Sequence, residues 1–203
     1  GSRPAWMNDD AAVMVLDVGQ GDAILVRTGG GRHLLVDAGG TVSFRKPGDE
    51  WRERAEPYDV GRKLIVPLLL GRGVRALDAL VLTHLDQDHI GGAEAIVRNI
   101  PVRAIVFNGS VKDSPAATRL FRLALDKGIP LYAAEAGMRW RPDGSSEAAV
   151  LYPFAAAGDE VPLVDEQNDR SVTLLLRLYG RTFVLPGDLE AAGERAVVSA
   201  AGK

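Results

Sequence analysis

Apolar and polar residues alternate along this chain in short blocks that predict a mixed α and β structure. Blocks rich in Val, Leu and Ile predict strands at residues 13–18, 23–28, 33–37, 77–82, 102–107, 131–133, 148–152, 172–178 and 182–185. Helix-like patterns cover residues 60–70, 93–99, 115–127 and 189–201. The pattern by itself predicts one domain, with α and β elements mixed.

Glycine, proline and serine mark several ends of these elements. The run Gly29–Gly31 suits a hairpin turn between the second and third strands. Ser114 is expected to cap a helix that begins at Pro115 and ends at Gly128, whereas Pro67 is expected to kink or shorten the helix over residues 60–70. The apolar stripe expected on the helix after Ser114 consists of Leu120, Phe121, Leu123 and Leu125.

Two polar stretches lack a regular pattern. Residues 41–57 carry charges of both signs around a single large apolar side chain, Trp51, and predict a loop. This loop could be a solvated face or a lid over a substrate. Residues 155–167 predict a second loop.

Composition narrows the function classes. The chain has 203 residues, of which 46% are hydrophobic and 25% charged, as in an ordinary soluble globular domain. Its net charge of -3 indicates no broad basic surface, so a DNA substrate would need bound cations and a local strip of Arg and Lys. No apolar run approaches the ~20 residues that span a bilayer. Gly1 and Ser2 resemble a cloning remnant, and residues 1–12 are expected to be a flexible lead-in. The absence of cysteine excludes a thiol nucleophile, disulfides and thiolate metal ligands.

The densest polar cluster follows the apolar run of residues 77–82. It places His84, Asp86, Asp88 and His89 within six residues, at the expected carboxyl end of a buried strand. Imidazole and carboxylate groups are ligands for divalent cations, and the loop contains no Lys or Arg to offset its carboxylates. An extended turn would place His84 and Asp86 on one ion and the other pair on a second. The alternative is a solvated acidic turn that caps a helix.

Other candidate polar residues lie at turns, where each could serve a structural role in the turn instead of a functional one. Gln20 and Asp22 belong to a glycine-rich turn between the first two strands, and Asp37 ends the third strand. Asp188 follows the last strand and could simply cap the next helix. His33 is expected to be a surface residue, because it is remote in sequence from the other clusters.

Three motifs in order resemble a known family. The His-x-Asp-x-Asp-His pattern at residues 84–89 resembles the metal loop of the metallo-β-lactamase superfamily, in the variant with Asp where most members carry a second His. Together with residues 17–23 and 35–40, it is similar to the hydrolase domain of ComEC-type DNA-uptake (competence) proteins. The resemblance extends over about residues 13–190.

The resemblance implies a fold and a function. The implied fold is an α/β, four-layer αββα sandwich that forms one domain over residues 1–203. The implied function is a metal-dependent nuclease or phosphodiesterase that degrades the non-imported DNA strand with a metal-activated water. The implied partners are DNA, expected to be single-stranded, and the membrane channel portion of the same full-length protein. Such a domain would be soluble and lie on the extracytoplasmic side of a bacterial membrane, without an organic cofactor.

The resemblance also assigns residues. The implied metal ligands are His84, Asp86, Asp88, His89 and Asp188. Of these, Asp88 and Asp188 would be catalytic, and Asp188 would bridge two divalent ions. Asp37 would orient the metal loop, and the residues that would border the substrate groove are Gln20, Asp22, Asn168 and Ser171. The ligand set is rich in oxygen, which favours Mn²⁺, with Zn²⁺ or Mg²⁺ as alternatives.

One feature departs from the family. ComEC-type domains carry a further histidine pair after the Gly-Asp helix, whereas the histidines here are His33, His84 and His89. We therefore expect the C-terminal part of the domain to be missing from this sequence, with a weakened site as the alternative. Two other functions stay open: a catalytically silent module that binds nucleic acid or a partner, and a hydrolase of small phosphodiesters or esters.

Overall fold

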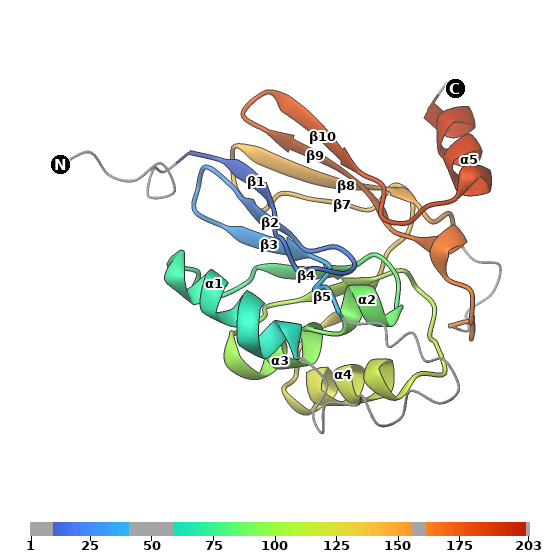
Figure 1. The fold of residues 1–203 in the computed structure, drawn as a ribbon. Helices are drawn as coiled ribbons and strands as arrows, with labels where there is room; N and C mark the ends of the chain where they lie inside the picture. The colour runs from blue at the N-terminus through green and yellow to red at the C-terminus, as the bar shows by residue number, and fades with distance from the viewer. Residues whose placement is uncertain (1–9, 41–58, 156–160, 202–203) are drawn as a thin grey trace.

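The computed structural model describes residues 10–40, 59–155 and 161–201. Two β-sheets pack face to face, and helices lie outside them (Figure 1). The loop or lid expected at residues 41–57 lies outside the described residues. Within the described ranges, no helix is both long enough and apolar enough to cross a membrane.

The first sheet has six strands in the order of the sequence. Its first three strands are antiparallel, and the pairs from β3 to β6 are parallel. The hairpin predicted at Gly29–Gly31 is confirmed, since it joins β2 to β3. The strands are β1 (Ala12–Val15), β2 (Ile24–Arg27), β3 (His33–Val36), β4 (Ala79–Leu82), β5 (Ile105–Phe107) and β6 (Leu131–Ala133).

The second sheet has four antiparallel strands in the order β10, β9, β8, β7. The sequence pattern did not predict the two-residue strand β7, because Arg and Trp alone carry no alternation. The strands are β7 (Arg139–Trp140), β8 (Ser146–Tyr152), β9 (Thr173–Leu178) and β10 (Arg181–Leu185).

Helices cover the outer face of the six-stranded sheet, and α5 lies beyond the four-stranded sheet (Figure 1). This is the αββα arrangement expected from the resemblance. The helical segments are η3 (Gly61–Ile65), α1 (Val66–Gly71), α2 (Gln87–Ile90), α3 (Ala93–Asn99), α4 (Pro115–Asp126), η4 (Asn168–Arg170) and α5 (Ala191–Ala201).

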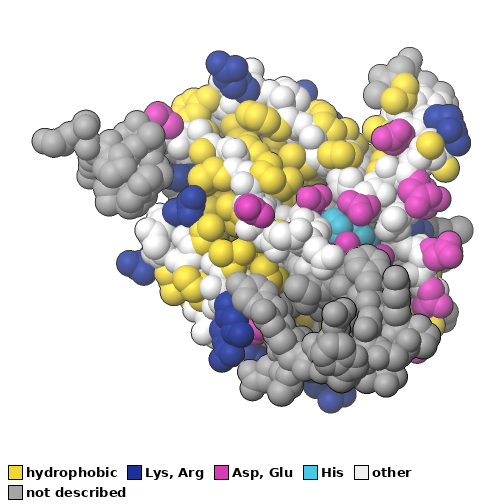
Figure 2. All heavy atoms as spheres, in the orientation of Figure 1, with side chains coloured by type: hydrophobic (Ala, Val, Ile, Leu, Met, Phe, Trp, Pro, Cys, Tyr) yellow, Lys and Arg dark blue, Asp and Glu magenta, His cyan; other side chains and the backbone are white. Residues whose placement is uncertain are grey.

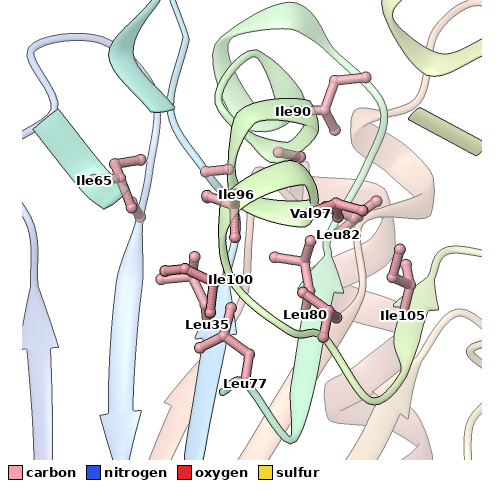
Figure 3. Packing of buried hydrophobic residues seen from close by; sticks show 14 of the residues in the cluster. Leu35, Ile65, Leu77, Leu80, Leu82, Ile90, Ile96, Val97, Ile100 and Ile105 are labelled. Atoms are coloured by element: carbon pink, nitrogen blue, oxygen red, sulfur yellow. The ribbon is translucent and has the colours of Figure 1, made fainter. Parts of the chain in front are cut away.

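Strand β4 shows why the sequence before the polar cluster is continuously apolar. Leu80 and Leu82 face the helices, and Ala79 and Val81 face the second sheet. Successive side chains point to opposite faces of a strand, so a strand covered on both faces needs apolar residues at every position. Figure 3 shows the helix-side core around Leu80. A buried, rigid strand therefore carries the residues that follow it.

The four predicted helical segments are present with two differences in detail, whereas α2 forms where an extended turn was expected, so that expectation was wrong. Ser114 caps α4 by accepting a hydrogen bond from Ala117 N at 3.4 Å, as predicted. However, Leu125 is 67% exposed, so its place in the predicted apolar stripe was wrong. The segment over residues 60–70 is one π-helical turn followed by α1, in which Pro67 lies in the first turn of α1. Val66 N donates to Gly61 O, so the π-helical turn continues into α1, and Pro67 lies where the one passes into the other.

Asp143 joins the hairpins of the two sheets at one end of the sandwich. Its carboxylate accepts hydrogen bonds from Gly30 N at 2.8 Å and Ser146 Oγ at 2.7 Å. Partial burial alone would raise the pKa of Asp143, but hydrogen bonds, including those from Thr28 and Ser145, outweigh burial and hold the pKa well below its usual range.

Replacing Asp143 by alanine is expected to lower the free energy of unfolding by about 1–3 kcal/mol at neutral pH. Because the pKa is depressed in the folded state, this stabilisation is present above the unfolded pKa of about 3.9 and is lost as the pH falls below it. Urea unfolding of both proteins at pH 7 and pH 3 measures the difference. Equal stability of the two proteins at pH 7 would contradict the role of Asp143.

Candidate metal centre

The site forms where the carboxyl ends of β3 and β4 lie side by side. The two strands are parallel, with Val36 opposite Val81. Asp37 follows β3, whereas Thr83 and His84 follow β4, and each of these three residues is 1% exposed. These three side chains are polar but shielded from solvent, where an unpaired polar group is costly.

Asp37 connects the two strand ends. Its carboxylate accepts hydrogen bonds from Thr83 N at 2.8 Å and from Thr83 Oγ1 at 2.6 Å. The same carboxylate lies 2.9 Å from Nδ1 of His89. Nδ1 therefore carries the proton that is donated to Asp37, and Nε2 of a neutral His89 keeps its lone pair for a ligand bond.

His84 is held in a comparable way. Its Nδ1 lies 3.1 Å from Thr83 Oγ1 and 3.4 Å from Ser171 Oγ. The hydroxyl hydrogen of Thr83 is donated to Asp37, so the Nδ1–H of His84 donates to Thr83 Oγ1 and leaves Nε2 available. The ring centroids of the two histidines lie 4.1 Å apart. Both imidazoles are thus fixed through Nδ1.

Asp188 completes a group of donors. It lies on the turn after β10, and one of its carboxylate oxygens is 3.3 Å from Nε2 of His89. One ligand atom each of His84, His89 and Asp188 lies within 4.8 Å of the others, which fits a single divalent cation. Gly187 allows this approach, because a Cβ on Gly187 would lie 3.0 Å from that of Thr83.

Charge at the site reflects the crowding of carboxylates. Burial by itself would lower the pKa of His89, but the hydrogen bond to Asp37 and nearby negative charges raise it to about 9. Burial and the neighbouring His89 lower the pKa of His84. Burial, together with the charges of Asp37 and Asp188, raises the pKa of Asp22. A bound cation would offset this excess of negative charge.

Asp86 and Asp88 lie outside the three-residue group. A carboxylate oxygen of Asp86 is 3.9 Å from His84 Nε2, and the other accepts a hydrogen bond from Lys112 Nζ at 2.5 Å. The three-residue group joins one histidine from each of the two pairs expected from the sequence. Lys112 comes from the loop after β5, so no signal within the motif indicated it.

The turn that contains Gln20 and Asp22 lies against the metal loop. A Cβ on Gly21 would fall 1.7 Å from the carbonyl oxygen of Asp88, so only glycine fits there. The carbonyl of Asp22 accepts a hydrogen bond from Gly39 N at 2.8 Å. The structure therefore brings this turn, the residues after β3 and the metal loop together.

The segment before β9 reaches the site through Ser171. Ser171 contacts His84, whereas the side chain of Asn168 contacts Glu190 at 3.5 Å. The sequence analysis did not predict a role for Gln167. In the structure Gln167 is 1% exposed, and its Oε1 accepts hydrogen bonds from Leu85 N at 2.9 Å and Asn108 Nδ2 at 3.2 Å. Gln167 thereby ties three loops together.

Acidic side chains surround the histidine surface in Figure 2. The described residues thus present two oriented imidazoles and an acidic rim. Such a site attracts cations and can hold a phosphate ester only with a cation present.

Comparisons with known proteins bear on this site. The chain is 30% identical over 194 residues to ComE operon protein 3 of Bacillus subtilis (strain 168), covering 95% of this chain and 24% of that protein. It is 34% identical over 197 residues to competence protein ComA of Neisseria gonorrhoeae, covering 97% of this chain and 22% of that protein. The chain spans about a quarter of the length of the curated relatives it matches.

Among solved structures, the chain is similar to CmlA, a diiron beta-hydroxylase from Streptomyces venezuelae. The identity is 19%, the TM-score is 0.49, and the match covers 90% of this chain and 30% of CmlA. The family model of the metallo-beta-lactamase superfamily matches residues 16–202, which include every residue of the site described above. The chain belongs to the metallo-beta-lactamase superfamily.

Proposed function

We propose that the chain is the metal-dependent phosphodiesterase domain of a competence protein and that it hydrolyses DNA. The observation that carries this proposal is the group of His84, His89 and Asp188, in which both imidazoles are fixed through Nδ1. Membership of the superfamily supports a metal-dependent hydrolase, and the names of the curated relatives support a role in competence.

The proposed roles follow from the contacts. His84, His89 and Asp188 hold a cation, and Asp37 and Thr83 hold the imidazoles in the orientation that this requires. A divalent cation, when bound, lowers the pKa of water and stabilises negative charge on a phosphate. The attacking group is water, since the chain has no cysteine and the described hydroxyls of the site are buried in hydrogen bonds.

Asp86 and Asp88 are proposed to supply oxygen donors for a second cation. Lys112 fixes one oxygen of Asp86 and leaves the other directed to His84 Nε2. Lys112 is thus a positioning residue in this proposal. The oxygen-rich set favours Mn²⁺ over Zn²⁺ or Mg²⁺. Asp22, Gln20 and Asn168 border the substrate, whereas Ser171, predicted to do so, is buried against His84.

The proposed substrate is single-stranded DNA, namely the strand that is not imported. We further propose that the domain is carried by a membrane channel and acts on the extracytoplasmic side of a bacterial membrane. Both proposals rest on the names of the competence relatives and on the resemblance stated above.

The test is hydrolysis of a 5′-labelled single-stranded DNA with Mn²⁺. The chain is expected to cut the DNA with Mn²⁺ and to stop when EDTA is added. Asp188→Asn should reduce the rate by about 100-fold or more, because one cation ligand is lost. Asp126→Asn, at an exposed site at the end of α4, is the matched control and should keep the full rate. Equal rates for both variants would refute the proposal.

A further inference from the structure

A second polar site lies at the opposite end of the six-stranded sheet, between the C-terminal end of α1 and the β2–β3 hairpin. It is a hollow of about 480 Å³, which we call the basic pocket. The residues that line the basic pocket are Arg27, Gly31, His33, Leu70, Gly71, Arg72, Gly73 and Arg75.

The fold explains why these side chains converge. Arg27 and His33 are directly opposite in the antiparallel ladder of β2 and β3. The adjacent residues Val26 and Leu34 face the second sheet, so Arg27 and His33 project to the helix side. There α1 ends at Gly71, and the next residues bring two more arginines to the same place.

The basic pocket concentrates positive charge in a chain whose net charge is -3. Among the residues that the structure describes, three arginines line it and no Asp or Glu does. The nearby Asp78 instead accepts hydrogen bonds from Arg32 Nη1 at 3.1 Å and His33 N at 2.9 Å. Burial and the charge of Arg27 lower the pKa of His33. A neutral imidazole among guanidinium groups suits recognition of an oxyanion.

The backbone leaves room for such a group. Apart from neighbours along the chain, no atom of the described residues lies within 4 Å of the position that a Cβ would take on Gly31, Gly71 or Gly73. A ligand can therefore approach the backbone of the basic pocket closely. Arg72 and Arg75 are exposed and form no ion pair within the described part of the chain, so their guanidinium groups are available for bidentate contacts with a phosphate.

We infer that the basic pocket binds a phosphate of a nucleic-acid strand whose continuation reaches the metal centre. The inference rests on the proposed function. One strand links the two sites, because β3 begins at His33 and Asp37 follows its last residue. At ~3.3 Å per residue this separates them by roughly 13 Å, a distance that a few nucleotides can span, and single-strand binding sites occupy ~4–16 nucleotides. In Figure 2, several Lys and Arg side chains lie to the left of the histidine, over the end that carries α1.

The test measures binding of a fluorescent 12-nucleotide single-stranded DNA in EDTA, so that hydrolysis does not occur. The double variant R72A/R75A is expected to weaken binding about tenfold and to lower the slope of log affinity against log salt by about 1.4. R98A/R119A is the matched control, since it removes two arginines that are paired with Glu94 elsewhere on the helix side. Its affinity should change less than twofold. Gly71→Ala, which adds a methyl group to the wall, should also weaken binding.

Two further measurements separate this inference from the proposed function. Hydrolysis of bis(4-nitrophenyl) phosphate with Mn²⁺ probes the metal centre alone, and R72A/R75A should retain it. If the unaltered chain hydrolyses neither substrate but binds DNA through the basic pocket, the proposed function is refuted and the nucleic-acid site is supported. Equal DNA binding by R72A/R75A and R98A/R119A would overturn the inference. Binding of R72A/R75A to phosphatidylglycerol vesicles is measured as well. If this variant loses binding to the vesicles but keeps its binding to DNA, the inference is overturned and the pocket is assigned to a lipid headgroup.

Discussion

Replacing His89 by alanine is expected to abolish tight binding of Mn²⁺ and to lower DNA hydrolysis by about 10³-fold. His89 supplies one of three donor atoms that lie within 4.8 Å of one another, and its ring is fixed by Asp37. Loss of a ligand removes several kcal/mol of transition-state stabilisation that a cation provides, and about 4 kcal/mol corresponds to this factor. Calorimetric titration with Mn²⁺ and the labelled-DNA assay measure the two effects.

The controls for this variant concern folding. His89 is buried, so circular dichroism and thermal unfolding must show that the alanine variant is folded before its affinity is interpreted. His89→Gln, which keeps a polar side chain of similar size, should show the same loss. Unchanged Mn²⁺ affinity in two folded variants would exclude His89 from the centre.

Asp37→Ala is expected to have the second largest effect, because it changes both stability and metal binding. The substitution removes three hydrogen bonds and leaves the N–H and hydroxyl of Thr83 buried without their acceptor. Leaving such partners unsatisfied costs about 3–5 kcal/mol of folding free energy. The imidazole of His89 also loses its orientation, which should lower Mn²⁺ affinity by about 10–100-fold.

Urea unfolding in EDTA and calorimetric titration with Mn²⁺ separate the two effects of Asp37. Asp37→Asn is the informative companion, because its amide oxygen can still accept from Thr83 N, whereas its NH₂ group can accept from neither Thr83 Oγ1 nor His89 Nδ1. It should therefore keep part of the stability and lose most of the affinity. An alanine variant with both properties unchanged would show that Asp37 is only a turn residue.

Much of the fold could be predicted because local patterns and long-range packing agree. The run at residues 77–82 is apolar at each position except Asp78, as a strand covered on both faces requires, and Ser114 and Pro115 mark the start of a helix. The prediction that Leu125 faces the core was wrong, because an apolar side chain near the end of a helix can point to solvent.

The site was predictable only in part. The motif at residues 84–89 follows a buried strand, and parallel pairing brings Asp37 beside it. Lys112 and Gln167 could not be predicted, since they reach the metal loop from distant loops and belong to no local pattern. The basic pocket could not be predicted either, because its arginines come from a strand, a helix end and a loop that lie close together only in the folded chain.

Anomalous scattering from a crystal soaked in Mn²⁺, recorded at the manganese edge, tests the central claim most directly. The account predicts a peak within about 2.5 Å of Nε2 of His84, Nε2 of His89 and a carboxylate oxygen of Asp188. A soaked crystal that diffracts well but shows no anomalous peak at these three side chains would contradict the account.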